Sequence, residues 1–224
     1  MKPLFRDRRD AGRALAAKLL VSTNVATPAV VLALPRGAVQ VAFEVACAFR
    51  SPLDVCVVRR LEVPKREGVV MGAIVSNSVL ILLQAVVKEF AVTEQELIKA
   101  IRKQAKELAR HERAYRGDRE AVALKGESVI LVDDGLTDGA SLKTAIAAIR
   151  LRGAERLTLA MPTTSMQGYR DLKPLADDLI CFEEPVPAHA IAPWYAELAE
   201  VSDLEVRRLH AQARGIAQRW PYLN

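Results

Sequence analysis

The sequence predicts an α/β fold: a doubly wound, mainly parallel sheet with helices on both faces and a small hairpin excursion beside it. Short apolar runs rich in β-branched residues alternate along the chain with helical patterns. Of the 224 residues, 51% are hydrophobic and 26% are charged, which is ordinary globular composition. The chain contains no repeat and no Pro/Gly/Ser-rich linker, so we expect residues 1–224 to form a single domain.

The predicted strands are apolar runs without a polar alternation. This pattern is typical of strands that are covered by helices on both faces, as in a parallel sheet. The runs are AVVLAL (29–34), LDVCVV (53–58), SVILV (128–132), RLTLAM (156–161) and DLICF (178–182). Strands of this kind, with helices between them, are expected to be joined by right-handed crossovers.

The segments between the strands carry the predicted helices. A long charged helix over 93–116 begins at Thr93, which has the spacing of a capping box with Glu96. Gly117 and Gly153 each follow a predicted helix, where a glycine commonly ends it. The other predicted helices cover residues 38–50, 140–152 and 165–175.

The uncharged stretch 68–87 is about as long as a membrane span. A Ser-Asn-Ser sequence at 76–78 interrupts it, so a hairpin over 71–83 is the better prediction. Residues 1–20 are rich in arginine but contain Asp7 and Asp10, so they resemble neither a signal nor a transit peptide. We interpret them as an amphipathic first helix and expect a cytoplasmic protein with no membrane association.

Charge and cysteine content exclude some classes of partner. The net charge is +5 and the pI about 9.2, with acidic residues interleaved among the basic ones. There is no Lys/Arg stripe with interleaved aromatics, so we expect anionic small ligands and no nucleic acid. Cys47, Cys56 and Cys181 lie in apolar runs without metal-ligand spacing, which predicts buried thiols in a reducing compartment.

Polar clusters follow three of the predicted strands, at the end where α/β sheets bind ligands. They are Pro35-Arg36-Gly37, Arg59-Arg60 and Asp133-Asp134. Two adjacent carboxylates repel each other unless a cation or a hydrogen-bond donor satisfies them. A sugar diol or a hydrated Mg²⁺ would do so; in the alternative interpretation, Asp134 only opens the turn and Asp133 is solvated.

The loop 135–141 leads directly from the acid pair into a predicted helix. Backbone N–H groups therefore converge at a helix N-terminus, an arrangement that binds phosphate. Ser141 offers its hydroxyl as a further donor. The sequence thus predicts a phosphate site beside a diol or metal site.

The segment VILVDDGLTDGAS resembles the ribose-phosphate-binding signature of the type I phosphoribosyltransferases. LALPRGAVQVAFEVA resembles the pyrophosphate loop of a subgroup of phosphoribosyltransferase-domain proteins. FRDRRDAGRALA, LDVCVVRRL and the WY…VSDLEV tail are similar to the same subgroup. The resemblance extends over nearly the whole chain.

The resemblance implies transfer of ribose 5-phosphate from phosphoribosyl pyrophosphate (PRPP) to a nitrogenous base, with Mg²⁺ as cofactor and release of pyrophosphate. Asp133 and Asp134 would hold the ribose hydroxyls, directly or through the metal, and would be catalytic together with Arg36. Arg36 and Gly37 would present backbone N–H groups to the pyrophosphate across a cis non-proline peptide. The residues implied around the 5-phosphate are Thr137, Asp138, Gly139, Ala140 and Ser141.

Other residues carry two interpretations. Arg59 and Arg60 are further candidates for the pyrophosphate, or else a solvated strand end. Trp194 and Tyr195 could cover an acceptor base, or else pack in the core, and Tyr115 is expected to pack. We expect a homodimer, since dimers are the commonest assembly.

The sequence departs from the family pattern at the phosphate loop. Asp138 stands where the signature usually has Thr, and Thr137 where the family commonly has an acid proposed as a base. Ala38 replaces a second Gly of the pyrophosphate loop. The alternative to an enzyme is therefore a non-catalytic relative, a sensor or regulator that binds a nucleotide or phosphosugar. VILVDD also resembles the acidic pocket of response-regulator receivers, but those carry the pair at the first strand.

Overall fold

The computed structural model describes residues 3–22, 25–136, 139–183 and 194–218. Its larger sheet has five parallel strands in the order β2-β1-β6-β7-β8. These strands are β1 (Val30–Ala33), β2 (Leu53–Val55), β6 (Ser128–Val132), β7 (Arg156–Met161) and β8 (Asp178–Cys181). The predicted parallel sheet is confirmed, and each strand lies within one of the predicted apolar runs.

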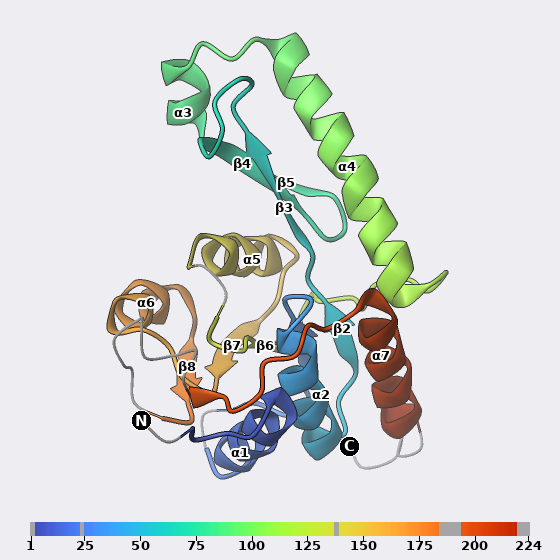
Figure 1. Cartoon of the computed structure of the whole chain (residues 1–224). Helices are drawn as coiled ribbons and strands as arrows, with labels where there is room; N and C mark the ends of the chain where they lie inside the picture. The colour runs from blue at the N-terminus through green and yellow to red at the C-terminus, as the bar shows by residue number, and fades with distance from the viewer. Residues whose placement is uncertain (1–2, 23–24, 137–138, 184–193, 219–224) are drawn as a thin grey trace.

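Helices cover both faces of the parallel sheet, as predicted. On one face pack α1 (Arg8–Leu20), α2 (Ala38–Phe49) and α7 (Asp203–Gln218); on the other pack α5 (Gly139–Leu151) and α6 (Met166–Leu172), followed by the short η1 (Lys173–Leu175) (Figure 1). Alternate residues of a strand enter opposite cores: Val31 packs with α1 and α2, whereas Leu32 packs with α5. This explains why the strand sequences are apolar throughout.

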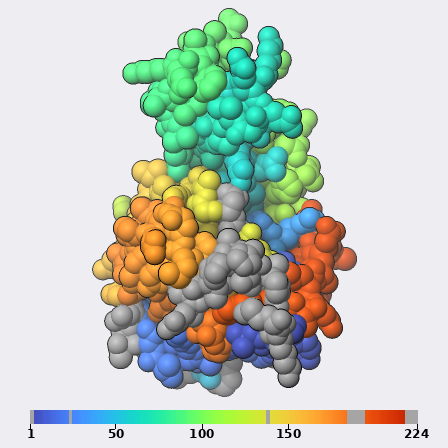
Figure 2. All heavy atoms as spheres, turned by 60° about the vertical axis from the view of Figure 1, so that its left-hand side comes forward, coloured from blue at the N-terminus to red at the C-terminus, as the bar shows by residue number. Residues whose placement is uncertain are grey.

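The second sheet is larger than the predicted hairpin. It has three antiparallel strands, β3 (Val58–Glu62), β4 (Val70–Val75) and β5 (Val79–Leu82), and is followed by α3 (Gln84–Glu89) and α4 (Glu94–Arg116). The predicted turn at 76–78 is confirmed, with Asn77 and Ser78 at φ values of 64° and 58°. We call residues 58–116 the antiparallel lobe and the remainder the parallel lobe. In Figures 1 and 2 the antiparallel lobe stands above the parallel one.

The antiparallel lobe has a small core of its own. Leu61 and Met71 from the sheet, with Val63 just after β3, pack against apolar residues of α3 and α4. The capping box predicted at the start of α4 is present, since Thr93 and Glu96 exchange hydrogen bonds. The last turn of α4 instead packs into the parallel lobe through Tyr115. The helix therefore connects the two lobes.

A buried ion pair fixes the end of α4 to the parallel lobe. The Nε atom of Arg116 donates to Asp54 Oδ1 in β2 (2.6 Å), and a terminal nitrogen donates to the carbonyl of Val55 (2.6 Å). Both side chains are almost completely buried. Burial alone would raise the pKa of Asp54, but His210 and Arg116 lower it overall.

The structure also bears on the cysteines and on the length of the helices. Cys56 and Cys181 are buried as predicted, whereas Cys47 on α2 is only half-buried. Among the helices that the structure describes, none is long and apolar enough to cross a membrane.

Candidate active site

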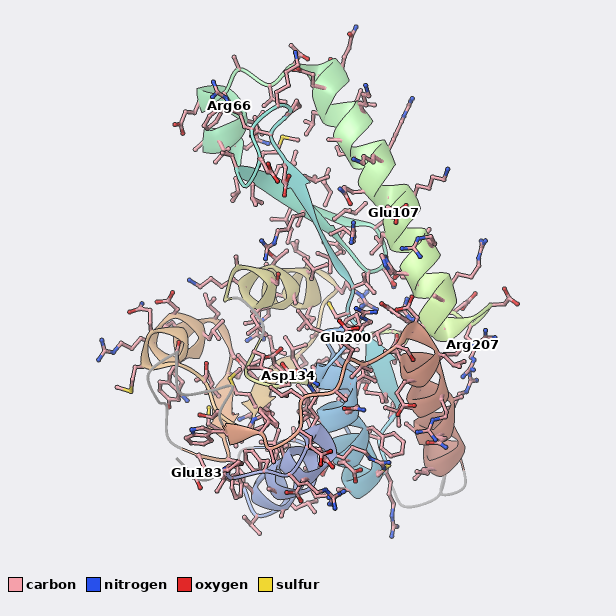
Figure 3. The ribbon with its side chains drawn as sticks, viewed as in Figure 1. Arg66, Glu107, Asp134, Glu183, Glu200 and Arg207 are labelled. Carbon is pink, nitrogen blue, oxygen red and sulfur yellow. The ribbon has the colours of Figure 1, made fainter. Side chains whose placement is uncertain are left out.

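Two of the predicted clusters meet at one edge of the parallel sheet. Strands β1 and β6 are neighbours in parallel register, with Ala33 opposite Val132. The segments that follow them, Pro35-Arg36-Gly37 and Asp133-Asp134, therefore emerge side by side. Figure 3 shows Asp134 near the centre of the molecule, below α5, at this edge.

The acid pair is buried and held by hydrogen bonds. Asp133 is 0% exposed and Asp134 4%. Asp133 Oδ2 accepts from the N–H of Gly135 (2.8 Å), and Asp134 Oδ1 accepts from the N–H of Leu136 (3.1 Å). The interpretation that Asp133 is merely solvated is therefore wrong. The position of these carboxylates is fixed before any ligand binds.

Arg8, in the first turn of α1, is a site residue that was not predicted from the sequence. Its Nε atom donates to Asp134 Oδ2 at 2.8 Å, and the two side chains are 13% and 6% exposed. One signal in the sequence could have indicated it. A cation in the first turn of a helix is opposed by the helix dipole, so another interaction is needed to hold it there.

Gly37 makes the close approach of these groups possible. It is the N-cap of α2, and the preceding Pro35–Arg36 peptide bond is cis, which confirms the cis non-proline peptide implied by the resemblance. A β-carbon at this position would collide with Asp134 Oδ2 and would lie 2.7 Å from the Nε atom of Arg8. No larger residue fits between the two segments without moving one of them.

The predicted phosphate loop is described only in part. Thr137 and Asp138 lie outside the described residues. Gly139 and Ala140 are exposed in the first turn of α5, and no atom lies within 4 Å of the β-carbon position of Gly139. Ser141 is half-buried and points toward the antiparallel lobe, where Arg60 donates to its Oγ atom (3.3 Å). The N-terminal turn of this helix is thus accessible to a ligand.

Arg59 and Arg60 were predicted to follow the end of a parallel strand. The structure places them elsewhere. The run 53–58 is split between β2 and β3, so both arginines lie inside the antiparallel sheet. Arg59 Nε donates to Gln104 of α4 (3.1 Å), whereas Arg60 reaches Ser141 on α5. Because the two residues are consecutive in β3, their side chains point to opposite faces of the sheet.

A cavity of about 520 Å³ extends from Arg36 toward α4. Its lining residues include Arg36, Arg59, Arg110 and Asp203. Arg36 is half-exposed and lies 3.8 Å from Asp203. This distribution of charge favours an anionic ligand.

The far wall of this cavity is aromatic. The rings of His111 and Tyr115 lie 6.0 Å apart in a stacked arrangement on α4. Burial, together with the charge and hydrogen bond of Asp203, raises the pKa of Tyr115 to about 12. Tyr115 packs in the core as predicted, and its hydroxyl stays neutral at physiological pH.

A second, more apolar cavity of about 310 Å³ lies between the antiparallel sheet and α5. Its walls are formed by small and aliphatic residues of β4 and β5, among them Gly72, Ala73 and Ile81. Val58 and Ser141 line both cavities. A cationic and an apolar compartment therefore adjoin each other at the start of α5.

Trp194 and Tyr195 are core residues. They pack with Phe5 in a small aromatic cluster, and both are buried. The Tyr195 hydroxyl donates to the backbone carbonyl of Asp134 (2.7 Å). The alternative in which these aromatics cover an acceptor base is not supported, but Tyr195 helps to fix the acid pair.

The acid pair does not fit a protein-held Mg²⁺ in this arrangement. Mg²⁺ needs oxygen ligands in near-octahedral geometry. Asp134 has one oxygen on a backbone N–H and the other on the guanidinium of Arg8, which repels a second cation. Among the described residues, no three His, Cys, Asp or Glu side chains form a group that could hold a metal. We therefore assign no chemical step to a metal ion.

Sequence comparison agrees with this geometry. The family model of the phosphoribosyl transferase domain matches residues 6–200. The chain belongs to this family. Its fold is accordingly that of the type I phosphoribosyltransferases, with the antiparallel lobe inserted after β2. The match includes the first helix and therefore Arg8.

Named relatives are of the same kind. A Mycobacterium tuberculosis (strain H37Rv) protein named "Putative phosphoribosyl transferase Rv0571c" is 38% identical over 91% of this chain. The chain spans only 45% of that protein's length. The crystal structure of TT1426 from Thermus thermophilus has a TM-score of 0.79 and 32% identity, and the match covers 95% of this chain and 99% of that one. A Neisseria gonorrhoeae protein solved with bound ppGpp has the same fold at 14% identity, with a TM-score of 0.50 and coverage of 96% and 99%.

Proposed function

We propose that this protein is a phosphoribosyltransferase that transfers ribose 5-phosphate from PRPP to a nitrogenous base and releases pyrophosphate. The observation that carries the proposal is the contact between the segment after β1 and the acid pair after β6. A β-carbon on Gly37 would collide with Asp134, so backbone N–H groups and carboxylates are adjacent there. PRPP needs this adjacency, because its diphosphate is attached to C1′ and its two ribose hydroxyls are on the next carbons, C2′ and C3′.

The charges around the site suit the reaction. As the bond from C1′ to the diphosphate oxygen breaks, its electron pair leaves with pyrophosphate and positive charge grows on the ribose. Asp133 and Asp134 would hold the ribose hydroxyls and stabilise that positive charge. Arg36, Arg59 and Arg110 would stabilise the departing pyrophosphate in the cationic cavity. The lone pair of the acceptor nitrogen then forms the new bond to C1′, and the proton of that nitrogen is released to solvent.

The 5-phosphate would lie at the start of α5. Gly139 and Ala140 would offer backbone N–H groups there, with Thr137 and Asp138 as predicted neighbours. Ser141 and Arg60, which are hydrogen-bonded to each other, would add a hydroxyl and a guanidinium. This proposal moves Arg60 from the pyrophosphate to the 5-phosphate, because it reaches α5 rather than the cationic cavity.

The second cavity supports a largely apolar acceptor. Its walls are mainly aliphatic, and it adjoins the cationic cavity at Val58 and Ser141. Arg60 and Lys143 at its edge would disfavour a cationic acceptor. A neutral nitrogenous base is therefore the acceptor class that we propose.

The experiment that tests this function is a binding and turnover assay. Calorimetry with PRPP, pyrophosphate and ribose 5-phosphate should show tightest binding for PRPP, because it occupies both phosphate sites. Neutral bases are then screened for release of pyrophosphate in the presence of PRPP. Absence of PRPP binding would overturn the proposal; binding without turnover of any base would favour the second candidate.

The second candidate is a non-catalytic member that binds a nucleotide or phosphosugar as a sensor or regulator. It is favoured by the ion pair of Arg8 with Asp134, which occupies a carboxylate that catalysis would need. The N. gonorrhoeae structure with bound ppGpp makes that nucleotide a suitable test ligand. Tighter binding of ppGpp than of PRPP would support this candidate.

A further inference from the structure

We propose that Arg8 takes the place of a metal ion at the acid pair, so that this protein binds its diphosphate ligand without needing Mg²⁺. The inference rests on the proposed function for the identity of the ligand. Its first part, that the acid pair binds no divalent cation, concerns the free protein and can be tested without any ligand.

The guanidinium is built into the site and is not a chance surface contact. Its Nε atom donates to Asp134 Oδ2 (2.8 Å), and a terminal nitrogen donates to the carbonyl of Ala199 (2.9 Å). The absence of a side chain at Gly37 leaves the space that it occupies, since a β-carbon there would lie 2.7 and 2.9 Å from two of its nitrogens. Three separate segments thus fix one side chain.

The start of α1 is itself fixed relative to the acid pair. The backbone N–H groups of Leu4 and Phe5 both donate to the carbonyl of Trp194 (2.9 and 2.8 Å). In the other direction, the N–H of Ala196 donates to the carbonyl of Phe5 (2.9 Å). Tyr195, in the same segment, donates to the carbonyl of Asp134. The segment after residue 193 therefore holds both partners of the ion pair.

The electrostatic consequence is local neutralisation. Two buried neighbouring carboxylates need positive charge nearby, and a metal ion could supply it. Here Arg8 supplies one positive charge, and N–H groups of Gly135 and Leu136 donate to the pair. A divalent cation would have to displace a partly buried guanidinium that is itself held by Ala199. Arg8 therefore already occupies the position at the acid pair that a divalent cation would take.

The ligand end of the site has its own positive charge. Arg36, Arg59 and Arg110 line the cavity, and Asp203 is the one acid among its described lining residues; Arg36 lies 3.8 Å from Asp203, and Arg110 pairs with Glu107 outside the lining (3.1 Å). A diphosphate can be neutralised there by guanidinium groups rather than by a bound metal. Metal-independent binding follows from these two features together.

The first experiment is a Mn²⁺ titration of the full chain without other ligands. Electron paramagnetic resonance measures the free Mn²⁺ at each point. The wild-type protein should show no site at the acid pair, so Asp134→Asn should leave the titration unchanged. Arg8→Gln should create a Mn²⁺ site that binds about tenfold or more tightly than any residual binding to the wild-type protein, and Asp134→Asn added to it should remove that site. Arg8→Lys, which keeps the charge, should behave like wild type.

The matched control is Arg9→Gln. Arg9 is the next residue of α1 and also forms an ion pair, with Glu44 (2.6 Å), but it does not contact the acid pair. It should leave the Mn²⁺ titration unchanged. Thermal unfolding of each variant reports loss of structure separately. If Arg8→Gln does not fold, the comparison of wild type with Asp134→Asn still tests whether the acid pair binds a divalent cation.

The second experiment measures PRPP affinity by calorimetry in EDTA and in Mg²⁺. The wild-type ratio should stay within about threefold, and Arg8→Gln should make binding depend on Mg²⁺ by about tenfold or more. A wild-type Mn²⁺ site that Asp134→Asn abolishes would overturn the inference, as would an Arg8→Gln variant that gains no site. If PRPP binds no variant under any condition, the proposed function fails, and the Mn²⁺ titration still decides the role of Arg8.

Discussion

The two lobes contribute to the candidate site in different ways. The parallel lobe contributes through chain direction: strands β1 and β6 end at the same edge, so Gly37 and the acid pair meet there. The antiparallel lobe contributes side chains from within its elements, Arg59 near the start of β3 and Arg110 in the last two turns of α4. The first contribution depends on strand pairing, and the second depends on how firmly α4 is attached to the parallel lobe.

The strongest attachment is the buried cluster at the end of α4. Asp54 accepts hydrogen bonds from Arg116 and from the N–H groups of Val55 and Val122. Asp54→Ala removes the buried carboxylate and leaves the Arg116 guanidinium with only the partly exposed Glu112 as a charged partner (2.8 Å), so we expect a loss of about 3–5 kcal/mol in the free energy of unfolding. Urea denaturation at pH 7 measures it. Asp178→Ala, which removes a partly exposed pair with Arg156, is the control and should have little effect.

The same carboxylate should govern acid stability. The pKa of Asp54 is below its ordinary value of 3.8 in the folded protein, because His210 and Arg116 outweigh the effect of burial. Its contribution is therefore fully present above pH 3.8 and is lost as the pH falls through the lower, folded-state pKa. The difference in the free energy of unfolding between wild type and Asp54→Asn should accordingly become smaller as the pH falls below 3.8. A difference that stays constant from neutral to strongly acidic pH would contradict the assignment.

The parallel lobe is tested at Asp133. This buried carboxylate is proposed to bind ribose hydroxyls, and hydrogen bonds to a charged group contribute more than neutral ones. Asp133→Asn should weaken PRPP binding by about 10–100-fold while the protein remains folded. Calorimetry and thermal unfolding measure the two quantities. Asp171→Asn, an exposed acid on α6 that pairs with Lys143, should leave the affinity unchanged.

The antiparallel lobe is tested at Arg110. Arg110 lines the cationic cavity from α4, so Arg110→Met should weaken pyrophosphate binding by about tenfold, and less at high salt. Arg113→Met is the matched control, because Arg113 is exposed on the same helix and does not line the cavity. Equal effects of the two substitutions would mean that only general charge matters. The proposed contribution of the antiparallel lobe would then be wrong.

How much can be predicted from the sequence also differs between the lobes. The strands of the parallel sheet can be identified because burial on both faces leaves continuous apolar runs. The division of the run 53–58 between β2 and β3 cannot be predicted from the sequence, because Cys56 and Val57 are as apolar as the strands on either side. As a result the sequence alone assigns Arg59 and Arg60 to a parallel strand end rather than to a second sheet.

The candidate site can be predicted where its residues are adjacent in the sequence. The acid pair, Gly37 and the start of α5 each lie directly after or before an apolar run, so their positions follow from the fold. Arg8 and Asp134 are separated by 126 positions, and no local pattern connects them. Arg110 likewise enters the site only because α4 returns to the parallel lobe.

The smallest expected effect separates the two ends of α4. At its first turn, Thr93 accepts from the N–H of Glu96 (3.3 Å), and Glu96 accepts from the N–H of Thr93 (3.0 Å). Thr93→Ala should lower the free energy of unfolding by about 1 kcal/mol, the usual cost of losing a helix cap. Thr93→Ser keeps the hydroxyl and should recover most of that stability.

Ligand binding should not respond to the loss of this cap. Arg110 lies in the last two turns of the 23-residue helix, where Tyr115 packs in the core of the parallel lobe and Arg116 pairs with Asp54. Hydrogen exchange should therefore increase in the first turn of α4 in Thr93→Ala, while pyrophosphate affinity stays at the wild-type value. If affinity falls together with the cap, the antiparallel lobe transmits changes along α4 as one rigid unit. The two lobes would then be coupled over the whole length of the helix, and not only through the cluster around Asp54.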